Sequence, residues 1–448
     1  MSAVTVKEAP GSKGSSSGVL KVRQIIADLG SDIERNPNNA HSYKDRGVAF
    51  FSLGEFEQAI ADHSKAVSLD PCHVEAYLCR GDAYRFIREN RKAITDYDQV
   101  IRLDPLNATA YLNRGVTYDA FGELHTAIAD VSRAIEIKTD FAAAYGNRGG
   151  LYGKTGQFQL AMEDLDRAIR LDPNQAAWYA NRGAAHANRG HYREAMADLE
   201  RAIELNPRDS YAYLGRANIH FLLKEYWEAF FDYGRALLIN PNEAAVAERL
   251  RTSYLSVLKE CNDKIAQDPS NASAYYERGS LYKEVGETDR AIADYDKAIN
   301  LNRAFTAAFS DRGRAYYRLG QYEKAVADFD RAIALMPEDP LLYYDSGSAY
   351  GSMKDFRKAV AQYDRAIALN PSDAAAYKDH AKMQTMLGEY QRALVDFERA
   401  ISLSPNDAQT YYLRGTVYKL MGEMQGAKAD FDRAASLNPK FAAVPETR

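Results

Sequence analysis

A pattern with a period of 34 residues runs along most of this 448-residue chain and constrains its fold more than any other feature. Glycine recurs at this interval in two series, which are Gly47, Gly81, Gly115, Gly149, Gly183 and then Gly279, Gly313, Gly347, Gly415. We number each repeat so that this glycine takes position 8, and we name a repeat by its first residue. Repeats 40, 74, 108, 142, 176 and 210 form a first block, and repeats 272, 306, 340, 374 and 408 form a second.

Each repeat has the periodicity of a helical hairpin. Positions 4, 8 and 11 share one face of a first helix, and positions 17, 20, 24, 27 and 28 share one face of a second. A glycine inside a helix costs about 1 kcal/mol relative to alanine, so its recurrence at position 8 predicts a close backbone approach. Position 20 is alanine in all eleven repeats and is the expected partner.

The ends of both helices are also marked. Glycine at position 15, present in eight repeats, is expected to end the first helix, and proline at position 32, present in nine, to end the second. The residue before the next first helix is expected to cap it in five places: Asn107, Asp209, Asp339, Asp373 and Asp407.

Arginine at position 7 and aspartate at position 23 vary together. Nine repeats carry the arginine and ten carry the aspartate, and the one repeat without the aspartate, which has Gln362, has Ser346 in place of the arginine. The joint loss predicts an ion pair between the two helices of a repeat, which would set their register more than it adds stability. Anion binding by the arginines is the functional alternative.

This arrangement of aromatic residues, glycine, alanine and proline resembles the tetratricopeptide repeat, and the resemblance covers residues 40–441. The resemblance implies an all-α fold, a right-handed solenoid of helix-turn-helix repeats. In that family a concave groove, lined mainly by the first helices, usually binds peptides or helices, and the family's clamp for chaperone tails is absent here.

The period also divides the chain. We expect a flexible tail at residues 1–18, a capping helix at 19–39, the first block at 40–243, a linker at 244–271, the second block at 272–441 and a tail at 442–448. Between Val246 and Ile265 the linker keeps helical spacing without Gly or Pro, which predicts one long helix that offsets the second block. Two helices that break near Thr252–Ser253, or an ordinary degenerate repeat, are the alternatives. The last helix is expected to expose an apolar flank, open to self-association or covered by the tail.

Composition and motifs argue against catalysis. The net charge is −5, the three cysteines lack metal or disulfide spacing, and the eight histidines are scattered. Phosphate-loop, nucleophile-elbow and metalloprotease motifs are all missing. We expect no enzyme activity, no cofactor and no bound metal. Since no apolar run reaches the roughly 18–20 residues of a membrane span, we expect a cytoplasmic protein.

Two sets of groove residues are candidate binding sites. In the first block, Asn113, Asn147 and Asn181 occupy position 6 of successive repeats, and in some family members such a ladder holds an extended peptide backbone. In the second block, Lys283 and nine further residues form a basic, tyrosine-bearing set, partly offset by acids at position 6, that would suit an acidic peptide. The nine are Tyr276, Arg314, Tyr317, Arg318, Tyr344, Lys378, Lys382, Tyr412 and Lys419.

The sequence therefore favours a non-catalytic scaffold that binds partner peptides or helices in its groove. Ordinary solvated surface remains the simpler reading of both sets. Single-stranded nucleic-acid binding by the second block is the main alternative function, and the negative net charge argues against it. Self-assembly through the C-terminal end, giving a homo-oligomer, is a further one.

Overall fold

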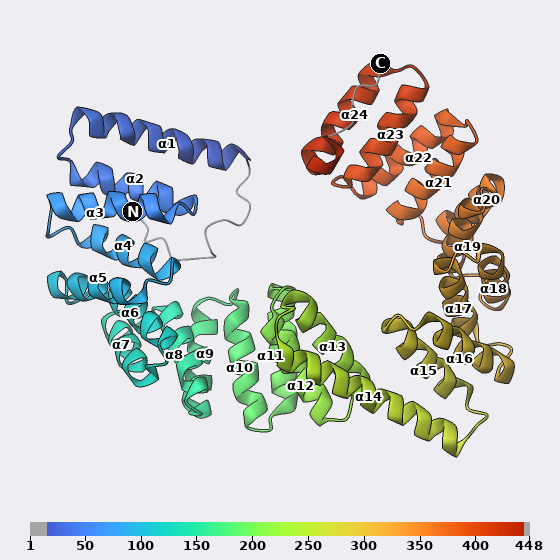
Figure 1. Cartoon of the computed structure of the whole chain (residues 1–448), viewed down its shortest axis with the longest axis horizontal. Coiled ribbons are helices and arrows are strands. Elements are labelled where there is room, and N and C mark those ends of the chain that lie inside the picture. Colours follow the sequence, from blue (N-terminus) through green and yellow to red (C-terminus); the bar gives the residue numbers. More distant parts are fainter. Residues whose placement is uncertain (1–15, 443–448) are drawn as a thin grey trace. The chain divides into compact units, whose positions relative to one another are not determined.

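The computed structural model describes residues 16–442, which form 24 α-helices, one short 3-10 helix and no strand. Contacts divide the chain into an N-terminal unit, residues 1–253, and a C-terminal unit, residues 254–448. In each, successive helices pack as antiparallel pairs (Figure 1). The predicted tails lie almost wholly outside the described residues, except that α1 (Ser16–Arg35) begins inside the first of them.

The N-terminal unit contains six repeats, which follow α1 in the sequence. Their first helices are α2 (Ala40–Ser52), α4 (Val74–Phe86), α6 (Ala108–Ala120), α8 (Ala142–Lys154), α10 (Ala176–Asn188) and α12 (Ser210–Leu222). Their second helices are α3 (Phe56–Leu69), α5 (Asn90–Leu103), α7 (Leu124–Ile137), α9 (Phe158–Leu171), α11 (Tyr192–Leu205) and α13 (Tyr226–Ile239).

The C-terminal unit contains five repeats. Their first helices are α15 (Ala272–Glu284), α17 (Thr306–Arg318), α19 (Pro340–Ser352), α21 (Ala374–Met386) and α23 (Ala408–Leu420). Their second helices are α16 (Thr288–Leu301), α18 (Tyr322–Leu335), α20 (Phe356–Leu369), α22 (Tyr390–Leu403) and α24 (Met424–Leu437), and the 3-10 helix η1 (Pro439–Phe441) follows.

The predicted helix ends are confirmed. All eight glycines at position 15 have φ between 72° and 81°, a left-handed conformation that ends the first helix. Arg88, Lys224 and Lys354 take the same conformation in the other three repeats. The side chains of all five predicted caps accept a hydrogen bond from a backbone N–H in the first turn of the following helix.

The close approach at position 8 is real, but its main partner differs from the expected alanine. A Cβ on any of the nine glycines would lie 2.6–3.0 Å from a side-chain atom of position 24, for example the ring of Tyr97 over Gly81. The carbonyl oxygen of the alanine at position 20 is among the nearest atoms at only five of them, at 3.0–3.2 Å. Large buried side chains at position 24 therefore require the glycine.

The predicted ion pair is confirmed in all nine repeats that carry the arginine. Its Nε and Nη2 donate to both oxygens of the aspartate at position 23, at 2.6–2.9 Å. The guanidinium also lies 5.4–5.9 Å from the centre of the ring at position 4, which is tyrosine in eight of the nine. This contact accounts for eight of the 31 tyrosines.

The same arginines also join neighbouring repeats, which the sequence pattern did not reveal. In five of the nine repeats the remaining nitrogen, Nη1, donates to position 25 of the preceding repeat, for example from Arg114 to Asp98 at 2.6 Å and from Arg148 to Ser132 at 3.1 Å. One side chain therefore fixes both the hairpin and its stacking on the hairpin before it.

The linker residues form one uninterrupted helix, α14 (Ala244–Gln267). Its first half packs in the N-terminal unit, where Val246 and Leu250 contact the cluster around Tyr233. Its second half belongs to the C-terminal unit, where Asn262 accepts a hydrogen bond from Arg278 at 2.7 Å, with the sixteen-residue separation seen for Arg114 and Asp98. One helix thus acts as a first helix for one unit and a second helix for the other.

The C-terminal end is less apolar than expected. Positions 21 and 28 of a second helix pack on the next repeat, as Leu394 does with Val417 and Ile299 with Phe309. In the last repeat these positions are Lys428, which is exposed, and Ala435, which is half-buried. The short helix η1 also lies against the last repeat, since the Phe441 ring is 5.2 Å from that of Tyr412.

Candidate functional site

Polar side chains join adjacent first helices along the face where the groove residues were predicted. Position 6 of one repeat contacts position 9 of the repeat before it, as in the bond from Asn113 Nδ2 to Asp82 Oδ1, at 2.8 Å, and from Arg314 Nε to Asp345 Oδ2, at 2.7 Å. Arg249 on α14 bonds Asn218 in the same way. In these three places the polar side chain at position 6 and the one at position 9 satisfy each other.

This pairing is missing for Asn147 on α8 and Asn181 on α10. Position 9 of the preceding repeat is Val116 for Asn147 and Gly150 for Asn181, and neither has a polar side chain. Both asparagines are exposed, and Asn147 Nδ2 donates only to the Ala143 carbonyl of its own helix, at 2.7 Å. Both asparagines line a hollow of about 380 Å³ on this face.

A tryptophan and a glycine shape the hollow. Trp178 lies against the backbone of α8 so closely that a Cβ on Gly146 would stand 2.1 Å from its Nε1. The indole is half-buried, and it packs against the cluster of Ala161, Leu165 and Ala185 together with Phe158. Only glycine at residue 146 admits the indole in this place, which leaves small residues along the rest of the wall.

The lining of the hollow carries no unpaired charge. Its two charged residues are Asp119 and Lys154, and Lys154 Nζ donates to both oxygens of Asp119 at 2.7 Å. The other polar lining groups are the side-chain amides of Asn147, Asn181 and Asn188. The hollow is therefore neutral and offers hydrogen-bond donors and acceptors.

Asn113, the third rung of the expected ladder, lies apart from the hollow and is already bonded. Asp82 accepts hydrogen bonds from both Asn113 and the Tyr97 hydroxyl, the latter at 2.7 Å. Burial raises the pKa of Asp82, and these two bonds and nearby Arg85 oppose the rise. The structure thus brings together two of the three asparagines.

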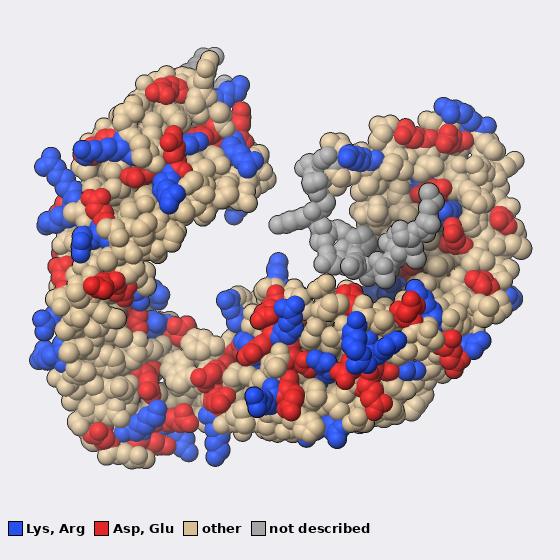
Figure 2. Space-filling model, turned by 180° about the vertical axis from the view of Figure 1, so that it is seen from behind, with Lys and Arg blue, Asp and Glu red and all other residues tan. Residues whose placement is uncertain are grey.

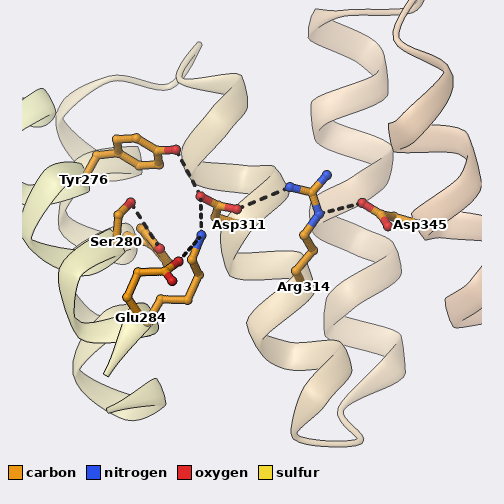
Figure 3. A network of polar contacts seen from close by, with 8 residues as sticks. Tyr276, Ser280, Glu284, Asp311, Arg314 and Asp345 are labelled. Carbon is orange, nitrogen blue, oxygen red and sulfur yellow. Dashed lines mark hydrogen bonds and ion pairs between the residues drawn. The ribbon is translucent and has the colours of Figure 1, made fainter. Parts of the chain in front are cut away.

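In the C-terminal unit, five of the ten predicted cations and tyrosines are paired with acids, and Figure 3 shows the network around Asp311 and Asp345. The Tyr276 hydroxyl donates to Asp311 at 3.0 Å, Lys283 Nζ lies 3.6 Å from the same carboxylate, and Arg314 bridges Asp311 and Asp345. Burial, and then the neighbouring Asp311, raises the pKa of Tyr276 to about 12. Two of the position-6 acids, Asp311 and Asp345, therefore pair with cations that were expected to attract an acidic ligand.

The remaining candidates of this unit divide into bonded and exposed groups. Tyr344 donates to Asp379 at 2.6 Å, Lys378 to Asp407 at 3.1 Å, and the Tyr317 hydroxyl accepts from Ser352 at 3.2 Å. The Tyr412 ring packs between Phe431 and Phe441. Three exposed cations form no ion pair within residues 16–442: Arg318, Lys382 and Lys419.

The charges on the surface are mixed. On the face drawn in Figure 2, Lys and Arg side chains alternate with Asp and Glu, and no large area of one sign forms among the residues described. A strong electrostatic footprint for nucleic acid would be a continuous basic stripe. Neither unit shows one on that face.

Comparison with known families decides the classification. Residues 149–216, and separately 108–141, 341–373 and 408–441, match the family described as tetratricopeptide repeat. Residues 47–85, 89–122, 279–320, 313–354 and 381–422 match the description TPR repeat. The chain belongs to the tetratricopeptide repeat family. Tetratricopeptide repeat proteins bind protein partners and are typically non-catalytic, which supports a protein-interaction scaffold as the general role.

Solved structures of this family resemble parts or most of the chain. MamA is 26% identical over 37% of this chain and 97% of its own, with a TM-score of 0.36. YrrB, described as a TPR protein with an unusual peptide-binding site, is 23% identical over 41% and 95%, with a TM-score of 0.35. Yeast Tom70 is 18% identical over 91% and 92%, also at 0.35. No curated protein sequence matches the chain. Across residues 16–442, no helix combines the length and hydropathy that a bilayer-spanning segment needs.

Sequence reasoning missed Trp178 and its contact with Gly146. A signal was available, since position 3 is alanine in most tetratricopeptide repeats of this chain but tryptophan in repeat 176. The residue that the indole covers, at position 5 of the preceding repeat, is glycine only in repeat 142. The large side chain of Trp178 therefore occupies the space that Gly146 leaves in the preceding repeat. This pair of unusual residues could have indicated the position of the hollow.

Proposed function

We propose that this protein is a non-catalytic interaction scaffold whose N-terminal unit binds an extended peptide segment of a partner protein at the hollow between α8 and α10. One observation carries the proposal. Among the described residues, Asn147 and Asn181 line the hollow without an inter-repeat partner, whereas Asn113, Asp311 and Asp345, at the same position of other repeats, are bonded to neighbouring repeats.

The chemistry of an amide suits this role. Each asparagine has a carbonyl oxygen and an NH₂ group, so it can pair with the N–H and C=O of any peptide unit regardless of sequence. A side chain without an internal partner exchanges only water for such bonds, whereas Asn113 would first have to release Asp82. The family's general role in protein binding supports the same assignment.

Selection from a library of random nine-residue peptides tests this function on the full-length protein. We expect selected peptides to bind the wild type and to lose at least tenfold in affinity to the Asn147→Ala/Asn181→Ala variant. Asn113→Ala is the matched control and is expected to keep the affinity. Selected peptides that bind both variants equally would contradict the proposal.

The two other candidate functions have less support. An acidic peptide or single-stranded nucleic acid in the C-terminal unit would rely on Arg318, Lys382 and Lys419, since the other cations of that face are paired with acids. Self-association through the C-terminal end would pack α24 of one copy against α24 of another. The exposed Lys428 would then lie in the interface, where other second helices have an apolar residue. We expect no salt-sensitive binding of oligonucleotides and no increase of average mass with protein concentration. An oligonucleotide affinity that falls steeply as salt rises would instead establish nucleic-acid binding.

A further inference from the structure

The hollow between α8 and α10 also has the features of a pocket for one particular kind of side chain. We infer that it accepts a large uncharged side chain, aromatic or branched aliphatic, of the bound peptide, against the indole of Trp178. This inference rests on the proposed function and specifies what the bound segment must contain.

Size and shape favour a large residue. The hollow measures about 380 Å³, and glycine and alanine residues line much of it. Backbone amides bonded by Asn147 and Asn181 would hold the peptide above it, so that one side chain of the segment points inward. A small residue such as alanine would leave most of the space and the Trp178 face without contact.

The electrostatics exclude a charged residue. Asp119 and Lys154 neutralise each other at 2.7 Å, and the remaining polar lining groups are neutral amides. A carboxylate or ammonium group placed here would lose water without gaining an opposite charge. An aromatic ring instead gains contact with the indole, in an offset or edge-on geometry.

Glycine at residue 146 keeps this pocket open. Because a Cβ at that position would stand 2.1 Å from Trp178 Nε1, alanine forces the indole away from α8 and into a different arrangement. Gly234 on α13 is a matched control in the same unit, since a Cβ there meets only Leu250, at the ordinary distance of 3.9 Å.

Fluorescence of Trp178 provides the test. The chain has two tryptophans, and the full-length Trp227→Phe variant leaves Trp178 as the only indole. It is titrated, at millimolar concentrations, with blocked peptides Ser-Gly-Ala-X-Ala-Gly-Ser in which X is Phe, Leu, Ala, Asp or Lys. Binding is measured in parallel by calorimetry. We expect the Phe and Leu peptides to shift the emission and to bind at least about tenfold more tightly than the Ala, Asp and Lys peptides.

Two variants separate this inference from the proposed function. Gly146→Ala in the same background is expected to reduce the preference for Phe over Ala below threefold, whereas Gly234→Ala retains it. Equal binding of all five peptides, weakened by Asn147→Ala/Asn181→Ala, would overturn the side-chain inference and leave the proposed function standing. Tightest binding of the Asp or Lys peptide would overturn the inference as well. If no peptide binds, both the inference and the proposed function fail.

Discussion

Helices α8 and α10 in the N-terminal unit, and α15, α17 and α19 in the C-terminal unit, are all first helices of their repeats. Their polar side chains are nevertheless paired to different extents. In the C-terminal unit, an arginine at position 9 meets an aspartate at position 6 of the next repeat, and Tyr276 and Lys283 complete a closed network. In the N-terminal unit, Asn181 meets Gly150 and a hollow remains. One pair of positions therefore decides whether two repeats satisfy each other or leave groups for a ligand.

Transferring the C-terminal pair into the hollow gives the largest expected effect. Gly150→Arg with Asn181→Asp copies the Arg314–Asp345 arrangement, fills the space and pairs the new charges. We expect peptide affinity to fall by a hundredfold or more while the thermal unfolding curve changes little. Calorimetry with a selected peptide measures the first effect and circular dichroism the second; full affinity in this variant would contradict the comparison.

Removing the C-terminal pair should destabilise that unit. Arg314→Ala leaves Asp345 partly buried without its cation and leaves Asp311 with only Lys283, 3.6 Å away, which we expect to cost about 2 kcal/mol locally at pH 7. Burial already raises the pKa of Asp345, and Arg314 opposes that rise. Loss of the arginine should therefore make the unit more stable as pH falls and Asp345 is protonated. Hydrogen exchange of α17 and α19 measures this effect, and Arg314→Ala/Asp345→Asn should recover much of the loss.

The two units should also differ in their response to acid. Position 24 is Tyr295 in repeat 272 but His63 in repeat 40, where both ring nitrogens are buried without a hydrogen-bond partner among the described residues. Burial, and then the charges of Arg80, Lys44 and His73, lowers the pKa of His63 from 6.5 to about 3. The folded state therefore keeps the imidazole neutral.

Because the unfolded chain takes up this proton more readily, the stabilisation is complete above pH 6.5 and is lost as pH falls toward 3. At pH 5 we expect the hairpin of α2 and α3 to be about 2 kcal/mol less stable than at pH 7.5. Hydrogen exchange of that hairpin at the two pH values measures the change. His63→Leu should remove the dependence, and an unchanged pH profile in that variant would show that another group is responsible.

The smallest expected effect concerns the end of the C-terminal unit. Lys428→Ile with Ala435→Ile restores the aliphatic side chains that other second helices present to the next repeat. We expect the wild type to remain monomeric and the variant to show a modest rise in average mass at high concentration. Light scattering detects it, and a wild type that self-associates equally would show that the lysine does not protect this end.

Much of the fold could be predicted from the sequence because the repeat multiplies each weak signal. A glycine at position 15 is uninformative alone, but eight copies in phase predicted helix ends that the backbone angles confirm. The covariation of Arg and Asp predicted nine ion pairs for the same reason.

The candidate site was less predictable because it depends on contacts between repeats. Position 6 suggested that Asn113, Asn147 and Asn181 were equivalent, and only the residue facing each one, Asp82, Val116 or Gly150, distinguishes them. The cations of the second block looked available for the same reason, since their pairing with Asp311, Asp345 and Asp407 crosses from one repeat to the next. The residue pattern within one repeat does not indicate pairs that form between two repeats.

The side-chain amide resonances of the three asparagines, assigned by substitution in the ¹⁵N-labelled protein, test most directly whether unpaired groups make the binding site. On addition of the Phe-centred peptide, we predict shifts for Asn147 and Asn181 and none for Asn113, which remains bonded to Asp82. A peptide that moves the Asn113 resonance, or that leaves both Asn147 and Asn181 in place while it binds, would contradict this account.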